Sequence, residues 1–254
     1  MTDSNPSPVA PAKRPPRAEP FSARLVAARA LTPSVREMTF ERTDDRALDF
    51  APGQWVSLMI PQESGDLRRS YSIASAPGKT GRFDIAVTHV AAGPGSSSLH
   101  AMEVGTTLQA IGPSGLFTRD ELDPAASLFV GTGTGITPFR SMIRAAFDAG
   151  SEPRLRLLIG VRREEDILYR AELEELSANH PSLDLFITLS QPPAGWNGRT
   201  GYVQNHLPEL WQGLGDPSAQ LYVCGLDRMV KTVRELARGD LGLDRKQVHQ
   251  ERYD

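Results

Sequence analysis

The stretch 127-SLFVGTGTGITP-138 combines a short apolar run, a glycine-rich turn and a proline near the start of a helix. An almost continuous apolar run such as residues 127–130 is typical of a strand covered on both faces. Backbone N–H groups and the helix dipole at such a turn can hold a pyrophosphate. The spacing is not G-x-G-x-x-G, because position 136 is Ile, and a Walker lysine is absent. A tight strand-to-helix connection without a ligand is therefore an open alternative.

The rest of the C-terminal half repeats this alternation of strand and helix. Further apolar runs lie at residues 155–159, 183–189 and 221–223. Helical stretches lie at residues 138–149, 169–178 and 227–238. This order predicts a doubly wound parallel sheet over residues 123–254, with ligands at the carboxyl ends of its strands.

The N-terminal half has a different pattern. Hydrophobic residues alternate with polar ones at residues 56–60 and 83–87, and similar runs surround residues 38–40 and 108–111. Short half-buried strands separated by Pro and Gly predict an antiparallel β-barrel over residues 21–122. The predicted fold class is thus a β-barrel domain followed by an α/β domain.

Composition excludes several kinds of site. The 254 residues are 39% hydrophobic, which is enough for real cores, and the net charge of -3 gives no overall field for nucleic acid. The lone cysteine, Cys224, excludes an internal disulfide, a four-cysteine iron–sulfur cluster and a cysteine-rich zinc site. The five histidines show no metal-binding spacing, so we predict no metal site. Redox chemistry in this chain would need a borrowed cofactor.

Residues 1–20 contain six prolines and predict a disordered tail, with a partner-docking tail as the alternative. Neither a secretory signal nor an apolar membrane span is apparent. We therefore expect a soluble, cytoplasmic protein that binds no membrane.

Two polar stretches of the N-terminal half could bind a ligand. In 68-RRSYSIAS-75, strand alternation would place Arg69, Tyr71 and Ile73 on one face and Ser70, Ser72 and Ala74 on the other. Arginine suits a phosphate, an aromatic ring suits a flat ring, and a hydroxyl suits a ring nitrogen. The second stretch, 93-GPGSSSL-99, could form an anion-binding turn or a flexible loop.

Together with four other motifs, these stretches resemble the ferredoxin–NADP reductase superfamily over residues 21–254. The six motifs occur in the family's order: Arg69-x-Tyr-Ser72, Gly93–Leu99, Gly112-Pro-Ser-Gly-Leu-Phe117, Gly131–Pro138, Val223-Cys-Gly225 and Glu251-Arg-Tyr253. The resemblance implies an FAD-binding barrel and an NAD(P)-binding sheet.

On the FAD side, the resemblance assigns roles to four residues. Arg69 is similar to the arginine that holds the pyrophosphate, and Ser96 to a serine that assists there. Tyr71 resembles the tyrosine that stacks on the isoalloxazine, and Ser72 the serine whose hydroxyl approaches the flavin N5. Further FAD contacts are expected from Ser70, Val87, Thr88, Gly95 and Ser97.

On the nicotinamide side, the catalytic candidates besides Ser72 are Cys224, Glu251 and Tyr253. Cys224 resembles the cysteine beside the nicotinamide, although a buried free cysteine is otherwise usually a small hydrophobe. Glu251 resembles the carboxylate near the reacting rings. Further cofactor contacts are expected from Gly133, Thr134, Gly135, Thr137, Pro138, Gly225 and Tyr253.

Two features depart from the family pattern. Tyr253 is followed by Asp254, whereas family members often end on a stacking aromatic residue, so packing near the flavin edge is the milder interpretation. Ser190 is followed by Gln191, where NADP-specific relatives carry an arginine. Arg162, Arg163 and Arg199 could clamp a 2′-phosphate or could be solvated, which leaves NADPH and NADH both open.

The resemblance implies a reductase that takes hydride from NADPH or NADH onto FAD. It would then pass electrons singly to a separate carrier, which could be a ferredoxin, a flavodoxin or an oxygenase component. The alternatives are an NADH-dependent reductase of a multi-protein oxygenase, which residues 190–201 favour, and a non-catalytic FAD-binding subunit. We expect a monomer.

Overall fold

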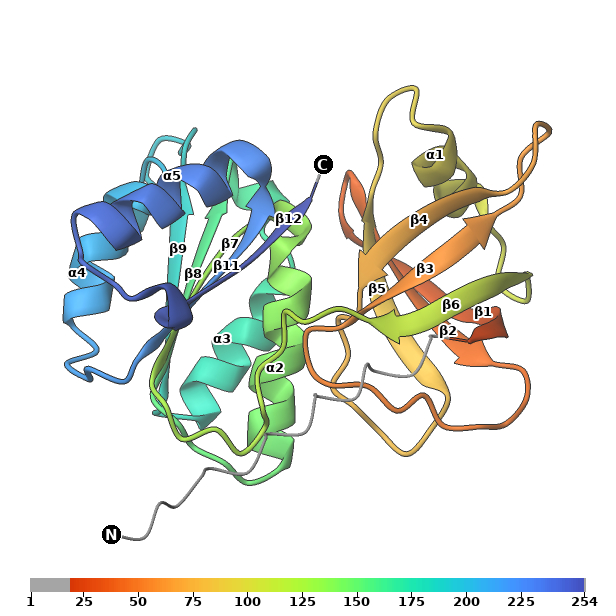
Figure 1. Cartoon of the computed structure of the whole chain (residues 1–254). Coiled ribbons are helices and arrows are strands. Elements are labelled where there is room, and N and C mark those ends of the chain that lie inside the picture. The colour runs from red at the N-terminus through yellow and green to blue at the C-terminus, as the bar shows by residue number, and fades with distance from the viewer. Residues whose placement is uncertain (1–18, 254) are drawn as a thin grey trace, which may run out of the picture.

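The computed structural model describes residues 19–253 and contains two six-stranded sheets that lie next to each other (Figure 1). Residues 1–18 of the predicted disordered tail lie outside the described residues. Pro20, which we had assigned to that tail, opens the first strand. No helix within residues 19–253 is both long and apolar enough to cross a membrane.

The N-terminal sheet is antiparallel throughout, with strand order β4-β3-β6-β1-β2-β5. Its strands are β1 (Pro20–Thr32), β2 (Val35–Arg42), β3 (Trp55–Ile60), β4 (Leu67–Ser72), β5 (Arg82–Thr88) and β6 (Thr107–Ser114). Alternate side chains of these strands, among them Phe40, Val56, Leu58 and Ile85, meet in one buried core.

The prediction of a closed barrel is wrong, because the sheet remains open between β4 and β5. Strand β4 pairs with β3 and ends at Ser72, and although it lies close to β5 it does not pair with that strand. Beyond that end, the Ala74 N–H donates to the Asp84 carbonyl at 2.8 Å, and no ladder joins the two edge strands within the described chain. The region we predicted as a barrel is therefore a curved sheet with two edges.

The C-terminal sheet is parallel, as predicted, with strand order β10-β9-β8-β7-β11-β12. Its strands are β7 (Ser127–Thr132), β8 (Leu155–Val161), β9 (Leu183–Leu189), β10 (Arg199–Thr200), β11 (Gln220–Leu226) and β12 (Val248–Tyr253). The chain runs outward from β7 to β10 and then returns to β11 on the other side of β7. The carboxyl ends of β7 and β11 therefore flank the switch point at which such sheets bind ligands.

Helices cover both faces of this parallel sheet (Figure 1). Helices α2 (Thr137–Asp148) and α3 (Arg170–Asn179) pack on one face, and α4 (Leu207–Gln212) and α5 (Asp227–Gly239) on the other. Single 3-10 turns lie at η1 (Gly133–Ile136), η2 (Glu164–Asp166), η3 (Val203–Asn205) and η4 (Arg245–Gln247). The doubly wound prediction is confirmed.

The two sheets meet across α2, whose outer face packs against the N-terminal half. Val35, Ala86 and Phe117 share a buried cluster with Phe139 and Met142 of α2. The connection at Gly53 allows this close approach. Its φ is +98°, and a Cβ there would lie 2.2 Å from the Phe117 carbonyl oxygen and 2.4 Å from the Met142 Cε. Only glycine suits this position.

Candidate active site

Strand β4 carries Arg69, Tyr71 and Ser72 from an exposed edge toward the other sheet. The Arg69 side chain is exposed, donates to the neighbouring Arg68 carbonyl at 2.9 Å and forms no ion pair with any described residue. Tyr71 is half-buried, and this burial raises its pKa to about 12. Ser72 is buried at the end of the strand. Along this segment the side chains therefore change from the exposed guanidinium of Arg69 to the buried hydroxyl of Ser72.

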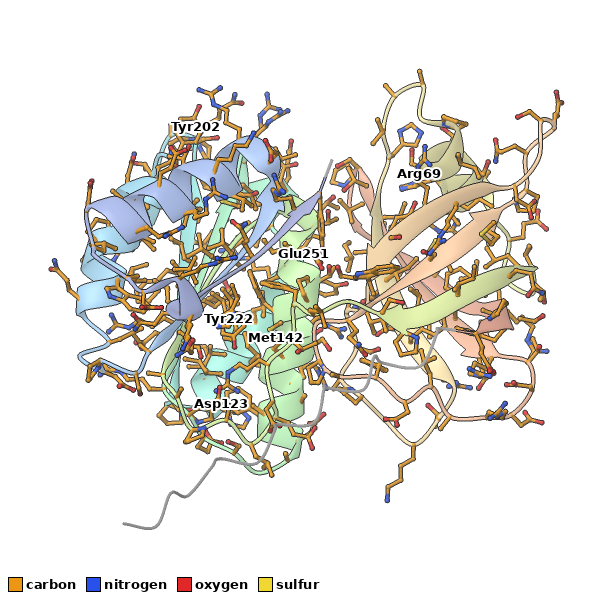
Figure 2. The ribbon with its side chains drawn as sticks, viewed as in Figure 1. Arg69, Asp123, Met142, Tyr202, Tyr222 and Glu251 are labelled. Atoms are coloured by element: carbon orange, nitrogen blue, oxygen red, sulfur yellow. The ribbon has the colours of Figure 1, made fainter. Side chains whose placement is uncertain are left out.

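The stretch 93–99, predicted as a turn or loop, instead begins a helix, α1 (Pro94–Ala101). Gly95 lets this helix lie close to β4, because a Cβ there would lie 3.1 Å from the Leu67 Cδ2. The Ser96 hydroxyl bonds the Gly93 carbonyl at 3.1 Å, and the Ser97 N–H donates to the same carbonyl at 3.0 Å. Figure 2 shows Arg69 next to α1, so a phosphate could meet both.

The other expected residues around α1 occupy different settings. Ser70 lies on the exposed edge, where its hydroxyl contacts the Ser57 hydroxyl at 2.9 Å. Val87 is buried near the end of β5, and the neighbouring Thr88 is exposed. The described structure thus places Ser70 on one edge strand of the N-terminal sheet, β4, and Val87 and Thr88 on the other edge strand, β5.

A chain of hydroxyl groups crosses from the N-terminal sheet to the C-terminal sheet. The Tyr253 hydroxyl donates to Ser72 Oγ at 2.6 Å, and Ser72 Oγ donates to Glu251 Oε1 at 2.9 Å. On the other side, Thr137 Oγ1 lies 3.3 Å from the Tyr253 hydroxyl and donates to the Thr134 carbonyl at 2.8 Å. These residues, distant in sequence, are thereby brought into one site, with Glu251 turned toward the boundary between the sheets (Figure 2).

Burial sets the protonation states in this chain. Removal from water raises the pKa of Glu251, and the hydrogen bond from Ser72 opposes part of that rise. Burial likewise raises the pKa of Tyr253, so its phenol stays neutral and can donate. The site therefore holds a carboxyl group whose proton is retained to a higher pH than usual.

Cys224 lies next to Glu251, because the two residues are register partners in β11 and β12. Its side chain is buried, and burial raises the pKa of the thiol. The thiol is therefore neutral and behaves as a small, polarizable group. A Cβ at Gly135 would lie 2.2 Å from the Cys224 carbonyl oxygen, so the glycine turn rests directly on this strand end.

The turn after β7 has the features of a site for an anionic nucleotide. Gly133 has a φ of +54° with no heavy atom within 4 Å of an added Cβ, and Pro138 stands in the first turn of α2. The Thr132 hydroxyl is buried without a hydrogen-bond partner among the described residues. This hydroxyl faces Gly225, and a Cβ at that position would lie only 2.3 Å from the Thr132 Oγ1. An unpaired buried donor at a strand end next to a helix N-terminus fits a phosphate or ribose group.

The three arginines expected near a 2′-phosphate lie in two places, two of them after β8 and one in β10. Arg162 and Arg163 follow β8 and are exposed, and Arg163 lies 3.5 Å from the exposed Glu165. Arg199, in β10, donates to both carboxylate oxygens of Glu209 at 2.8 Å. Arg162 forms no ion pair within residues 19–253 and is therefore the freest of the three.

Two residues were not singled out by sequence reasoning. Thr132 lies within the predicted motif Gly131–Pro138, but nothing in the sequence distinguished it from the rest of that motif. Arg140 is buried in α2 and contacts both halves of the molecule. An arginine in a helix is usually exposed to solvent, so no sequence pattern indicated this burial. Within residues 19–253, no group of three or more His, Cys, Asp or Glu could hold a metal ion.

Comparison with known proteins places two families on the two halves. The oxidoreductase FAD-binding domain family matches residues 22–118, and the oxidoreductase NAD-binding domain family matches residues 129–235. Ferredoxin–NADP reductase B of Sorangium cellulosum is 57% identical over 242 residues, which cover 94% of this chain and 99% of that protein.

More distant proteins share the fold. The glycine betaine monooxygenase reductase subunit of Pseudomonas aeruginosa is 30% identical over 222 residues, which cover 86% of this chain and 60% of that protein. The ferredoxin reductase in carbazole 1,9a-dioxygenase superposes with a TM-score of 0.81 at 22% identity, covering 93% of this chain and 70% of that one. A ferredoxin NADP+ reductase from Neisseria gonorrhoeae has a TM-score of 0.77 at 20% identity, covering 92% and 98%.

Proposed function

We propose a function from one premise: this chain belongs to the ferredoxin–NADP reductase superfamily and is an FAD- and NAD(P)-dependent oxidoreductase. Its electron donor is proposed to be NADPH and its acceptor a separate one-electron carrier, a ferredoxin or a flavodoxin. The relative that shares 57% identity over nearly its whole length is named for that reaction. The lone cysteine supports a separate carrier, because this chain cannot supply a four-cysteine cluster.

The division of labour is proposed to follow the two sheets, with residues 21–122 for FAD and residues 123–254 for the nicotinamide nucleotide. Bound FAD would supply the hydride acceptor and the one-electron donor. Arg69 would bind its pyrophosphate, since the guanidinium is exposed and unpaired among the described residues. Tyr71 would pack on its ring system. Further contacts are proposed from Ser70, Val87, Thr88, Gly95, Ser96 and Ser97.

The nicotinamide nucleotide would bind at the carboxyl ends of β7 and β11. Its phosphates would meet the turn after β7, where the Thr132 hydroxyl lacks a partner within the described residues. Arg162 is proposed for the 2′-phosphate, because Arg199 is already engaged by Glu209. Further contacts are proposed from Gly133, Thr134, Gly135, Thr137, Pro138, Arg163 and Gly225.

The observation that carries the proposal is the contact between Ser72 and Glu251. These residues are 179 positions apart, yet the hydroxyl donates to the carboxyl group at 2.9 Å across the two sheets. We propose that Ser72 orients the reacting ring on the FAD side and that Glu251 exchanges protons through it. The neutral thiol of Cys224 would pack beside the nicotinamide without adding charge.

Tyr253 occupies the space between Ser72 and Thr137. Any ring that enters between the end of β4, in the N-terminal sheet, and Cys224 has to displace the tyrosine side chain. We therefore propose that Tyr253 covers the site in the resting enzyme and swings aside when the nicotinamide binds.

A second candidate acceptor is the oxygenase component of a multi-protein system. It is favoured by relatives named as reductase subunits, at 29% and 30% identity. This chain spans only 63% and 60% of the length of those two proteins, so the ferredoxin or flavodoxin assignment is preferred.

One experiment tests the proposed function. The purified full chain is examined for flavin absorbance and titrated anaerobically with NADPH and with NADH. We expect a yellow protein that NADPH bleaches at lower concentration than NADH. Reduced protein is then mixed with oxidised ferredoxin, flavodoxin or oxygenase component. A colourless protein that takes up no added FAD would refute the proposal, and reoxidation by the oxygenase component alone would favour the second candidate.

A further inference from the structure

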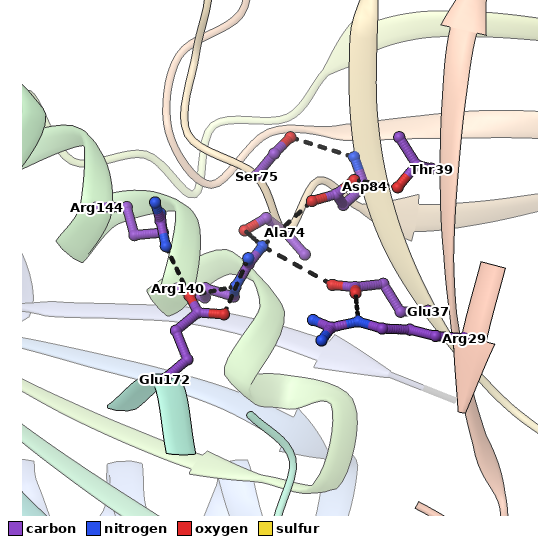
Figure 3. A network of polar contacts seen from close by, with 9 residues as sticks. All are labelled: Arg29, Glu37, Thr39, Ala74, Ser75, Asp84, Arg140, Arg144 and Glu172. Atoms are coloured by element: carbon purple, nitrogen blue, oxygen red, sulfur yellow. Dashed lines mark hydrogen bonds and ion pairs between the residues drawn. The ribbon is translucent and has the colours of Figure 1, made fainter. Parts of the chain in front are cut away.

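A buried arginine joins the two halves of the molecule next to the candidate active site. The Arg140 side chain in α2 is 9% exposed. Its guanidinium donates to the Ala74 carbonyl at 2.9 Å and to Asp84 Oδ2 at 3.4 Å, both in the N-terminal half. Figure 3 shows this group between the two halves, with Glu172 of α3 on its other side.

Glu172 fixes the orientation of this guanidinium. It accepts two hydrogen bonds from Arg140, at 2.8 and 3.1 Å, in a bidentate pair. The Tyr169 ring lies under the guanidinium, 4.6 Å from the ring centroid. A planar fork held by two oxygens on one side can reach the Ala74 carbonyl in only one direction. The arginine is therefore a rigid connector between α3 and the segment that follows β4.

This connector lies one helical turn from the glycine turn. Arg140 and Thr137 are three positions apart in α2 and so lie on the same side of the helix. Thr137 contacts Tyr253, which contacts Ser72, whereas Arg140 contacts Ala74, two residues beyond Ser72. Helix α2 is thus joined to the same short segment at two points.

We propose that Arg140 is a positioning residue that fixes the distance between Ser72 and the turn that precedes α2. The inference rests on the proposed function, in which Tyr253 moves aside as the nicotinamide binds. That movement opens the contact through Thr137 and leaves the Arg140 contact in place, because no hydrogen bond joins Arg140 to Tyr253 among the described residues. Arg140 then keeps the two cofactor sites in register while hydride is transferred.

The helix provides a matched control. Arg144 lies one turn further along α2 and binds the same carboxylate, Glu172, at 3.0 Å. It has no hydrogen bond to the N-terminal half within the described residues, and its side chain is 37% exposed. Arg144→Gln therefore removes a charge from the same cluster without breaking the connection between the halves.

The test measures FAD reduction by saturating NADPH in a stopped-flow instrument for the full-length wild type, Arg140→Gln, Arg140→Lys and Arg144→Gln. We expect the rate constant to fall about tenfold or more in Arg140→Gln, because small misplacements of reacting groups are costly. FAD content and the NADPH dissociation constant should stay unchanged. Arg140→Lys should recover part of the rate, and Arg144→Gln should match the wild type.

Hydrogen–deuterium exchange supplies a readout that needs no turnover. Backbone amides in residues 72–75 and 133–137 should exchange faster in Arg140→Gln than in Arg144→Gln. Should Arg140→Gln fail to fold, Asp84→Asn removes the negative charge that faces Arg140 on the N-terminal side and should slow reduction at unchanged NADPH affinity.

The outcomes separate the two proposals. A wild type that binds FAD and is reduced by NADPH, with Arg140→Gln and Asp84→Asn equally fast, overturns the positioning role alone. Equal losses in Arg140→Gln and Arg144→Gln also overturn it. A wild type that binds no FAD overturns the proposed function and this inference together.

Discussion

Adding one methyl group at Gly135 should slow hydride transfer while leaving FAD bound. A Cβ at this position would lie 2.2 Å from the Cys224 carbonyl oxygen and 2.7 Å from the carbonyl carbon. Both atoms belong to the backbone of β11 and cannot rotate away. Reaching an ordinary contact distance therefore requires the glycine turn and the strand end to separate by roughly 1 Å.

The size of the effect follows from this separation. A misplacement of about 1 Å at a reacting centre can cost about 100-fold in rate. This corresponds to roughly 2.7 kcal/mol of activation free energy. Since Gly135 lies in the turn proposed to bind the nicotinamide nucleotide, the loss should appear in FAD reduction by NADPH and not in FAD content.

The assay is single-turnover reduction of Gly135→Ala by saturating NADPH, followed through the absorbance of bound FAD. Gly150→Ala is the control, because Gly150 has a φ of +72° and no heavy atom within 4 Å of an added Cβ. Gly150 follows α2 at the end away from the site. Gly150→Ala therefore shows the effect of an added methyl group that strains the backbone but clashes with no other atom of the described residues. The reasoning would be refuted if FAD in Gly135→Ala were reduced at the wild-type rate. It would also be refuted if Gly150→Ala were slowed as much as Gly135→Ala.

Three further predictions concern stability and nicotinamide affinity. Gly53→Ala should lower the free energy of unfolding by about 1–3 kcal/mol more than Gly65→Ala, since both have positive φ but only Gly53 would clash, and equal urea midpoints would contradict this. Because burial raises the pKa of Glu251, the folded state holds the carboxyl proton more tightly than the unfolded chain does. The free energy of unfolding should therefore fall as the pH rises above 4.5, the usual pKa of a glutamate side chain. Glu251→Gln should remove this loss, so the urea midpoint of the variant should rise relative to that of the wild type between pH 4.5 and 7. A difference between the two midpoints that does not change with pH would contradict this prediction. Tyr253→Phe removes the hydrogen bond to Ser72, worth about 1 kcal/mol, and should tighten NADPH binding by up to about fivefold in anaerobic titration; unchanged affinity would argue against a covering role.

Hydrophobic periodicity was sufficient to predict an antiparallel sheet followed by a parallel sheet with helices. The parallel sheet follows from continuous apolar runs such as residues 127–130, and the antiparallel sheet from alternating runs such as residues 56–60. Closure of a sheet depends on which edges pair. Strands β4 and β5 lie close together without forming a ladder, and no local pattern carries that information.

Helix α1 was missed because its sequence has little helix propensity. Residues 94–101 contain glycine and three serines. The helix is held by tertiary contacts, since Leu99 is buried in the N-terminal core and Arg36 donates to the Leu99 and His100 carbonyls at 2.9 and 2.7 Å. Such contacts come from a strand about 60 residues earlier.

Buried arginines were likewise outside the reach of sequence patterns. Arg119 is 2% exposed and donates to the Asp123 and Ala125 carbonyls in the connection between the two sheets. Arg140 pairs with Glu172, and in each case the partners are known only once the chain is folded. Motif order supplied the candidate site residues, whereas the hydrogen bond between Tyr253 and Ser72 became visible only in the fold.

The long chain separation between Ser72 and Tyr253 determines when the enzyme can first become competent during its synthesis. The two residues are 181 positions apart, so a ribosome adds Tyr253 roughly 10–40 s after Ser72. Strands β1 to β6 are all made before that interval ends, whereas β12 is made last among the described strands. A nascent chain that has already folded its N-terminal sheet still lacks Glu251, and the site closes only when β12 docks beside β11.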